Sequence, residues 1–370
     1  MKTPRTILFL FTFLFSTIFA QGTINTEPWI DQIVRREFAL YTKTGISEDI
    51  IEFSWKKLRK KPEFHRYKII QGQIYGQPSR IKRLLELLAK TGPVPNVDFI
   101  YYYEDRIKKS FVDRKKKECA APIFVSAKDN TLKHFILFSD WLYDPTDETS
   151  GWNAAIQDIS ENQVPWESRK EVLFWRGSPY DGKHFQMYDF NNWKTIPRGT
   201  LVYQSQLHSN LIDAKFSKYP DKCIAQNPLR CRRELGAADF QSIPNQLQFK
   251  YHILIDGVTC TFPGTQWKLL SGSVPFKQDS PDIMYFYPDL IAWEHYIPVR
   301  NDLSDLLDKI NWARSHDSEA RKIANNARAF ALQRLMPQHI LEYCRAVLFQ
   351  YASLQNFSPT VSSDISGRQY

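Results

Sequence analysis

The sequence predicts an α/β protein whose strands form parallel sheets buried on both faces. Short apolar runs of strand length recur along the chain, and stretches with helical spacing of apolar residues alternate with them. Uninterrupted apolar runs, rather than alternating ones, are typical of parallel sheets that helices cover on both sides. The expected strands are residues 97–103, 122–126, 172–176, 251–256, 273–277 and 295–299.

The clearest helix and strand pair lies in the first third of the chain. Ser79 is placed to cap an amphipathic helix, which a Gly-Pro pair ends at Gly92. The strand expected at residues 97–103 follows at once and is rich in β-branched and aromatic residues. It places two carboxylates, Glu104 and Asp105, at its carboxyl end.

Three helices are expected after the last strand. Asn301 and Asp302 are placed to cap the first, and apolar residues at helical spacing continue through residues 320–330 and 340–351. Between the two groups of strands, residues 143–161 contain proline, glycine and short polar residues. We therefore expect a loop there that separates two domains.

The N-terminus carries the pattern of a cleavable secretory signal peptide. Residues 1–20 combine Lys2 and Arg5, a short apolar run and the small residue Ala20. This run is shorter than the roughly 20 apolar residues of a membrane-spanning helix, and no later stretch is long and apolar enough. We therefore expect a protein of the endoplasmic reticulum lumen or a secreted protein, without stable membrane insertion.

Charge and cysteine content narrow the classes of partner. The net charge of +9 comes from local runs such as residues 56–61 and 114–117, which fit solvated surfaces better than a nucleic-acid site. We therefore expect no nucleic-acid partner.

An oxidising compartment permits disulfides, and Cys223 and Cys231 are the best local pair among five cysteines. No close CxxC or HxxxH pair indicates a metal site.

Cations, small residues and hydroxyls gather at the ends of the later strands. Arg176, Gly177 and Ser178 stand where open α/β sheets bind ligands. Arginine can chelate a diphosphate, and glycine lets backbone amides approach its oxygens. A structural arginine at a strand end is the simpler alternative.

Residues 260–277 form a second candidate phosphate-binding segment, which follows Asp256. In it, a Pro-Gly turn and a short helix lead through the turn around Gly272 to a strand that ends at Lys277. A turn, a helix start and a lysine would suit a phosphate group. An ordinary helix between two parallel strands is the alternative.

Longer motifs resemble those of glycosyltransferase family 90, in particular its KDEL-containing and Rumi-type protein O-glucosyltransferases and the fungal capsule xylosyltransferases. The likeness extends over residues 96–352 and is strongest over residues 250–331. The motifs that carry it are PWES from Pro165, WRG from Trp175, KQDSP from Lys277, FYP from Phe286 and WEHYIPV from Trp293.

The resemblance implies a GT-B architecture, in which two Rossmann-like domains face each other across a cleft. The expected divisions are a signal peptide (1–20), an acceptor-side domain with the catalytic base (21–160), a nucleotide-sugar domain (161–335), a C-terminal helix that packs back on the first domain (336–355) and a mobile tail (356–370). The tail contains one glycosylation triplet, at Asn356.

The resemblance also implies a reaction and a set of site residues. The family inverts the anomeric centre without a metal or other cofactor, and one aspartate acts as general base. Asp105 matches that aspartate, and Glu104 is the competing carboxylate. The expected donor-binding residues are Arg176, Gly177, Ser178, Asp256, Thr261, Phe262, Lys268, Gly272, Ser273 and Lys277.

The expected function is transfer of glucose or xylose from UDP-glucose or UDP-xylose to a serine or threonine hydroxyl, with epidermal-growth-factor-like repeats as the family's usual protein acceptors. One alternative is a catalytically silent relative that binds a glycan or a client protein, and another is a transferase that acts on a glycan.

Three features depart from the family pattern. Relatives usually place an arginine in the turn that corresponds to residues 262–266, whereas this chain has a Pro-Gly-Thr sequence there, and Lys268 is the candidate replacement. Relatives commonly carry another basic residue after the WRG motif, and here Lys183 is the nearest cation. The C-terminus is not a KDEL-type retention signal.

Overall fold

The computed structural model describes residues 26–107, 121–139, 143–144, 146–147, 151–179 and 189–361. Several expectations therefore lie outside the described residues: the signal peptide, the basic run at residues 114–117, Cys119, Lys183 and the end of the C-terminal tail.

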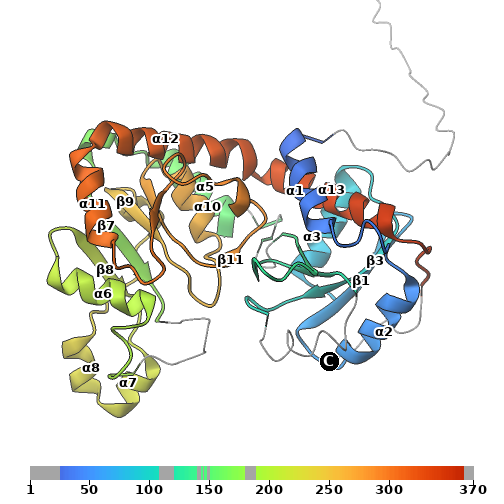
Figure 1. Cartoon of the computed structure of the whole chain (residues 1–370), viewed down its shortest axis with the longest axis horizontal. Coiled ribbons are helices and arrows are strands. Elements are labelled where there is room, and N and C mark those ends of the chain that lie inside the picture. The colour runs from blue at the N-terminus through green and yellow to red at the C-terminus, as the bar shows by residue number, and fades with distance from the viewer. Residues whose placement is uncertain are drawn as a thin grey trace, which may run out of the picture.

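Two five-stranded sheets organise the chain into two lobes, seen side by side in Figure 1. The sheet of the first lobe has the order β2-β1-β3-β4-β6. Its strands β3, β4 and β6 are parallel, whereas β1 runs antiparallel to both β2 and β3. These strands are β1 (Phe64–Ile70), β2 (Gln73–Tyr75), β3 (Val97–Tyr102), β4 (Ile123–Val125) and β6 (Phe135–Leu137).

The sheet of the second lobe is parallel throughout, with the order β12-β10-β9-β7-β8. Its strands are β7 (Lys170–Gly177), β8 (Ile212–Phe216), β9 (Phe249–Leu254), β10 (Val274–Gln278) and β12 (Ile297–Val299). The six strands expected from the sequence are all found as parallel strands, but the parallel strands β6 and β8 and the antiparallel β1 were not predicted.

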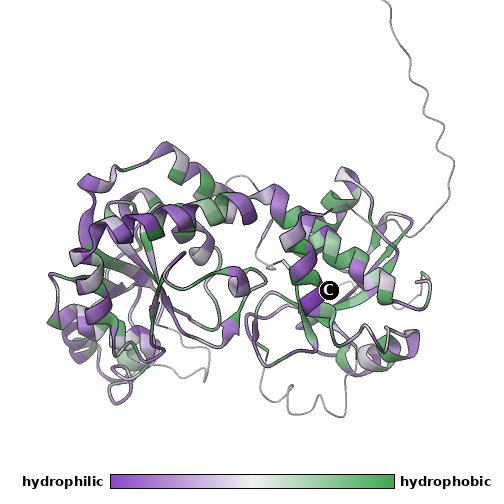
Figure 2. Cartoon of the chain, turned by 45° about the horizontal axis from the view of Figure 1, so that its top comes forward, coloured by the Kyte–Doolittle hydropathy of each residue, from purple (hydrophilic) through white to green (hydrophobic). Residues whose placement is uncertain are grey.

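Helices cover both sheets. They are α1 (Pro28–Phe38), α2 (Glu48–Leu58), α3 (Arg80–Thr91), α5 (Gly151–Glu161), α6 (Pro197–Leu207), α7 (Asp221–Gln226), α8 (Pro228–Glu234), α9 (Ile243–Gln246), α10 (Gly264–Leu270), α11 (Leu306–Ser315), α12 (Asp317–Arg334) and α13 (Pro337–Leu354), with short 3-10 helices η1 (Trp166–Ser168) and η2 (Tyr287–Asp289). Figure 2 shows hydrophilic residues along the outer turns of these helices. No helix in the described part of the chain is long and apolar enough to cross a membrane.

Two of the connections between the lobes stand out among the described residues. Helix α12 contacts α10 and β10 in the second lobe, and the chain then continues into α13, which contacts α1 and β3 in the first lobe (Figure 1). The second connection is a small antiparallel sheet, in which β5 (Lys128–Asp129) of the first lobe pairs with β11 (Asp282–Ile283) of the second.

Local sequence signals explain several helix ends. The Ser79 side chain accepts a hydrogen bond from the Lys82 amide, so the predicted cap of α3 is confirmed. The cap expected at Asn301 and Asp302 is wrong, because α11 begins at Leu306 after Asp305. Asp302 instead accepts a hydrogen bond from the Ser304 amide in the preceding turn.

Two boundaries differ from the sequence predictions. Residues 151–161 form helix α5 rather than a loop, because Trp152, Ala155 and Ile159 form an apolar face that is buried. The tail expected from residue 356 is anchored at its start: the Asn356 amide donates to the Ile46 carbonyl group, and the Thr360 carbonyl group accepts from Lys68.

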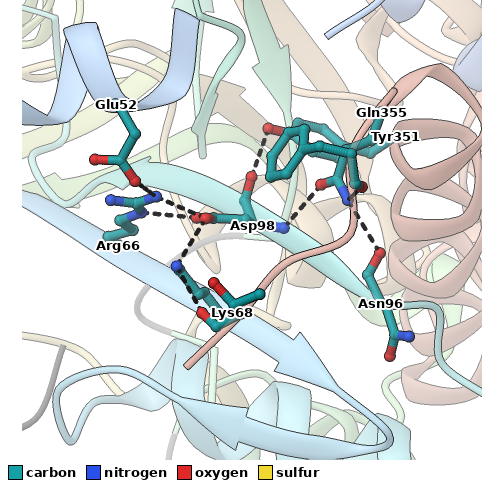
Figure 3. Close-up of polar contacts among 9 residues, drawn as sticks. Glu52, Arg66, Lys68, Asn96, Asp98, Tyr351 and Gln355 are labelled. Atoms are coloured by element: carbon teal, nitrogen blue, oxygen red, sulfur yellow. Dashed lines mark hydrogen bonds and ion pairs between the residues drawn. The ribbon is translucent and has the colours of Figure 1, made fainter. Parts of the chain in front are cut away.

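A buried polar network holds this C-terminal segment against the first sheet (Figure 3). The Asp98 carboxylate of β3 receives two hydrogen bonds from Arg66, at 2.7 and 2.6 Å, and its Oδ2 lies 3.2 Å from the Lys68 ammonium group. The Tyr351 hydroxyl donates to the Asp98 carbonyl group, and the Asp98 amide donates to Gln355. The network therefore ties the end of α13 to the middle of the sheet.

The expected disulfide between Cys223 and Cys231 is not formed. Both side chains are buried between α7 and α8, and Cys231 keeps a free thiol in hydrogen-bonding contact with Cys223. Burial raises the pKa of both thiols, to about 12 for Cys223.

Candidate functional site

The carboxyl edge of the second sheet brings together most of the predicted donor-binding residues. Ser178 follows β7, Asp256 follows β9, and Lys277 lies near the end of β10. Because these strands are parallel neighbours, their carboxyl ends lie at one edge of the sheet, where ligands bind in open α/β folds.

Arg198, which the sequence analysis missed, lies at the centre of this edge. It is the second residue of α6, and its guanidinium donates to the carbonyl groups of Ser178 and Asp256, both at 2.9 Å, and to that of Ile255 at 3.3 Å. Gly257 makes room for it, because a Cβ atom there would lie 2.5 Å from Arg198 Nη2. One signal was available in the sequence: a helix that follows a parallel strand starts at the carboxyl edge, and Pro197 marks that start.

The Asp256 carboxyl group lies beside this guanidinium. Burial raises its pKa, and a hydrogen bond with Ser280 and the positive charges of Lys277, Arg198 and Arg106 oppose that rise. Its Oδ2 atom is buried and has no hydrogen-bond partner within the described ranges. A polar group of a ligand at this edge would find an acceptor there.

Lys277, Thr261 and Phe262 complete the edge. The Lys277 ammonium group lies over the Tyr287 ring, 4.6 Å from its centroid, and donates to the Gln278 carbonyl group. Thr261 donates to the Ile255 carbonyl group, and Phe262 is partly buried against the apolar core shared with the first lobe.

Arg176 is held away from the role that the sequence suggested. Its guanidinium lies 2.9 Å from the Asp213 carboxylate on β8 and donates to the carbonyl groups of Trp175 and Asp213. Its side chain is buried and also lies over the Phe174 ring. These contacts fit the structural alternative for Arg176. Arg198 is also buried and bound to carbonyl groups, but it lies at the centre of the carboxyl edge and is therefore a second candidate diphosphate ligand.

Gly177 also has a packing role. A Cβ atom at this position would lie 2.4 Å from the ring of Trp175, which is itself buried. The close approach that excludes a side chain here is therefore to an aromatic ring of the protein.

Gly272 and Ser273 lie at the opposite edge of the sheet from the other candidates. They follow α10 and precede β10, so they stand at the amino end of that strand. Gly272 has a φ of 73°, which favours glycine, and the Ser273 hydroxyl donates to the Phe249 carbonyl group and accepts from Arg169. The prediction that these two residues bind the donor is therefore not supported by their position.

Lys268 lies beneath the site rather than in it. Its buried ammonium group donates to the Ile253 carbonyl group at 3.0 Å, and no carboxylate among the described residues pairs with it. Burial, helped by the positive charge of Arg198, lowers the pKa of Lys268 to about 7. The proposed replacement for the family arginine is thus a weakly charged group under the carboxyl edge.

The candidate base lies at the carboxyl end of β3 in the first lobe. Glu104 and Asp105 are both partly buried and occupy a bend that begins after Tyr103, beyond the last strand residue. Because neither residue belongs to the strand, the alternation of side chains along a strand does not place them on opposite faces. Arg106, the next residue, donates to the Asp282 carboxylate of the second lobe at 2.7 Å.

The histidine of the WEHYIPV motif has a structural position. His295 lies in a turn before β12 rather than in the strand, and its Nδ1 accepts a hydrogen bond from the Ile291 amide. Within the part of the chain that the structure describes, no three histidine, cysteine or carboxylate side chains are grouped to hold a metal ion.

Sequence comparisons place the chain among glycosyltransferases. Protein O-glucosyltransferase 3 of Homo sapiens is 31% identical over 204 residues, which are 55% of this chain and 36% of the relative. Protein O-glucosyltransferase 2 of Danio rerio is 29% identical over 280 residues, 75% of this chain and 51% of the relative. Protein O-glucosyltransferase 1 of Bos taurus is 25% identical over 322 residues, 82% and 75% of the two chains.

The chain thus spans about a third to a half of the length of the first two relatives. Among solved structures, a glycosyltransferase from Rickettsia africae ESF-5 aligns with 64% of this chain and 66% of its own, at 11% identity and a TM-score of 0.37, a likeness too low to bear on the fold. The family described as Glycosyl transferase family 90 matches residues 26–367. Because this match extends over nearly the whole chain, the protein belongs to glycosyl transferase family 90.

Proposed function

We propose that the chain is an inverting, metal-independent glycosyltransferase of GT-B architecture, which transfers glucose or xylose from a UDP-sugar to a serine or threonine hydroxyl of a protein. Family membership and relatives named protein O-glucosyltransferases support a protein acceptor. Acceptors with epidermal-growth-factor-like repeats and a place in the endoplasmic reticulum lumen or outside the cell belong to the same proposal.

One observation carries this proposal. The carboxylates that follow β3 in the first lobe are joined, through Arg106 and Asp282, to the second lobe, whose strand ends hold Arg198. The charge of Arg106 also acts on Asp256, at the carboxyl edge of the second sheet. A candidate base and a candidate donor site thus lie on facing parts of the two lobes.

The residues of the second lobe would bind the donor. A departing diphosphate needs positive charge, which Arg198 and Lys277 supply at the carboxyl edge. Arg198 is already oriented by three carbonyl groups, so its position costs little to fix when the donor binds. Asp256 offers a buried acceptor for a hydroxyl or ring N–H of the nucleoside.

The first lobe would supply the base. A serine or threonine hydroxyl is a poor nucleophile near neutral pH, and a positioned carboxylate can accept its proton as the glycosidic bond to the diphosphate breaks. Asp105 is the proposed base, and Glu104, in the same bend, is its competitor.

The test begins with the unaltered protein. Purified protein is incubated with UDP-glucose or UDP-xylose and an epidermal-growth-factor-like acceptor, with and without EDTA, and both UDP release and acceptor mass are measured. We expect transfer that EDTA does not abolish. Donor binding without transfer to any protein or glycan would instead favour the silent binding protein.

Variants then assign the roles. Asp105→Asn should lower kcat by about 10²–10⁴-fold and leave donor affinity unchanged, because the amide keeps the shape but accepts no proton. Glu104→Gln should remain active, and the reverse result would move the base to Glu104.

A matched pair of arginine variants tests the donor site. Arg198→Met should weaken donor binding by about ten- to a hundredfold, as expected for the loss of a charge-assisted hydrogen bond. Arg176→Met should instead lower the melting temperature, because Asp213 loses its partner. Equal donor affinity in Arg198→Met and the parent protein would contradict the assignment of Arg198.

A further inference from the structure

The segment that follows β3 is held by its neighbours on both sides of the lobe junction. The Arg106 carbonyl group accepts a hydrogen bond from the Tyr102 hydroxyl at 3.0 Å, within the first lobe. The Arg106 side chain donates from Nη1 to Asp282 Oδ2 at 2.7 Å, in the second lobe. The Asp282 side chain is only 4% exposed, so this ion pair is shielded from water on one side.

Asp282 is itself fixed to the first lobe through β11. Its strand pairs with β5, and the Asn130 amide donates to the Pro281 carbonyl group at 2.9 Å. Strand β5 is anchored in turn, because the buried Lys128 ammonium group donates to Glu37 of α1 at 2.6 Å. The backbone that carries the Asp282 carboxylate is therefore held in place where it binds Arg106.

We propose that the Arg106–Asp282 pair positions the Glu104 and Asp105 segment against the donor edge of the second lobe, so that Arg106 is a positioning residue for the transfer reaction. The inference rests on the proposed function. Its physical basis is that Arg106 directly follows the candidate base in sequence and is held at both its carbonyl group and its guanidinium, so loss of the ion pair frees the residue next to the carboxylates. A displacement of about 1 Å in a reacting group can lower a rate by about 10²-fold.

The experiment compares Arg106→Met, Asp282→Asn and the double variant with an unrelated ion pair. Arg321→Met is the control, because Arg321 Nη1 lies 2.7 Å from Glu167 Oε1 between distant segments on an exposed surface. The double variant leaves no unpaired charge, so it remains informative if either single variant is unstable. Each variant is tested for melting temperature, donor affinity, kcat and amide hydrogen exchange at residues 102–107.

We expect Arg106→Met and Asp282→Asn each to lower kcat by about 10²-fold with donor affinity within about twofold of the parent. The double variant should be no slower than either single variant, because the two residues act as one unit. Arg106→Lys, which keeps the charge, should recover much of the rate. Exchange at residues 102–107 should increase in the Met and Asn variants but not in the control.

Other outcomes would overturn the proposal. Weak donor binding in Arg106→Met with normal kinetics in Asp282→Asn would make Arg106 a donor ligand. The double variant could lose kcat by the product of the two single-variant losses, or amide hydrogen exchange at residues 102–107 could stay unchanged. Either result would show that the pair does not position the segment. If the parent protein transfers no sugar but exchange rises in the variants, the proposed function fails while the positioning of the segment by this pair stands.

Discussion

Asp98 in the first lobe and Lys268 in the second are both buried charged groups, with exposed fractions of 1% and 5%, but their surroundings differ. Asp98 is held between Arg66 and Lys68. Lys268 has one carbonyl group as acceptor, and Arg169 and Arg198 lie near enough to add to the positive charge around it and its neighbour His252.

The pKa directions express the same difference. Burial alone would lower the pKa of Arg66, but hydrogen bonds to Asp98 and Glu52 outweigh it and raise that pKa. Burial lowers the pKa of Lys268 to about 7, that of Arg169 to about 10, and that of His252 well below its ordinary value. The first lobe uses buried charge to hold its own C-terminal segment, whereas the second keeps Lys268, whose charge burial disfavours, beneath the edge where an anionic donor is proposed to bind.

The largest expected effect is the loss of the buried carboxylate. Asp98→Asn leaves Arg66 and Lys68 without its charge, and breaking a buried ion pair typically costs about 3–5 kcal/mol in the free energy of unfolding. Urea unfolding measures this loss. Glu52→Gln is the matched control, because Glu52 also binds Arg66 but its side chain is 50% exposed, so its loss should cost at most about 1 kcal/mol. Equal losses of unfolding free energy in Asp98→Asn and Glu52→Gln would contradict the view that the buried charge of Asp98 stabilises the first lobe.

Lys268→Met should change how the free energy of unfolding depends on pH. The folded pKa of about 7 lies below the ordinary value of 10.5, so the folded state binds fewer protons than the unfolded state between these values. The contribution of Lys268 to stability therefore rises with pH, by up to about 1.4 kcal/mol per pH unit. The difference in unfolding free energy between parent and variant, measured from pH 7 to pH 9, should show this slope. A constant difference would mean that Lys268 is charged in the folded protein.

The smallest expected effect concerns a neutral hydrogen bond of the Asp98 network. Tyr351→Phe removes the hydroxyl that donates to the Asp98 carbonyl group, and should cost about 1 kcal/mol. Tyr343→Phe is its control on the same helix, since the Tyr343 hydroxyl donates to the Leu137 carbonyl group outside the network. Similar melting temperatures for the two variants would confirm that charge is what distinguishes Asp98; a much larger loss in Tyr351→Phe would contradict it.

The sequence by itself determined the family and four of the five parallel strands of the second lobe. Buried parallel strands are recognisable because both of their faces are apolar, which is a local property of five or six residues. The Ser79 cap and the C-terminal helices are local signals too. Strands β1, β6 and β8 and helix α5 were not predicted. Strands β1 and β8 mix charged with apolar residues, β6 is only three residues long, and α5 lies in a stretch rich in loop-forming residues.

Within the site, chain order carried more information than residue type. A turn between a helix and the next parallel strand lies at the amino edge, which places Gly272 away from Ser178. The same reasoning puts Arg198, at the start of α6, on the carboxyl edge. Both positions follow from the order of elements once the sheet is known to be parallel.

Only the tertiary structure decided which charges meet. Asp213 takes the guanidinium of Arg176, and Asp282 takes that of Arg106 from 176 residues away. No periodicity or motif encodes such a pair, because ion-pair partners are selected by the packing of whole elements and by which carboxylate lies within reach of a buried cation. The sequence therefore indicated the candidate carboxylates and cations, and the fold determined which of those cations remain near the donor edge.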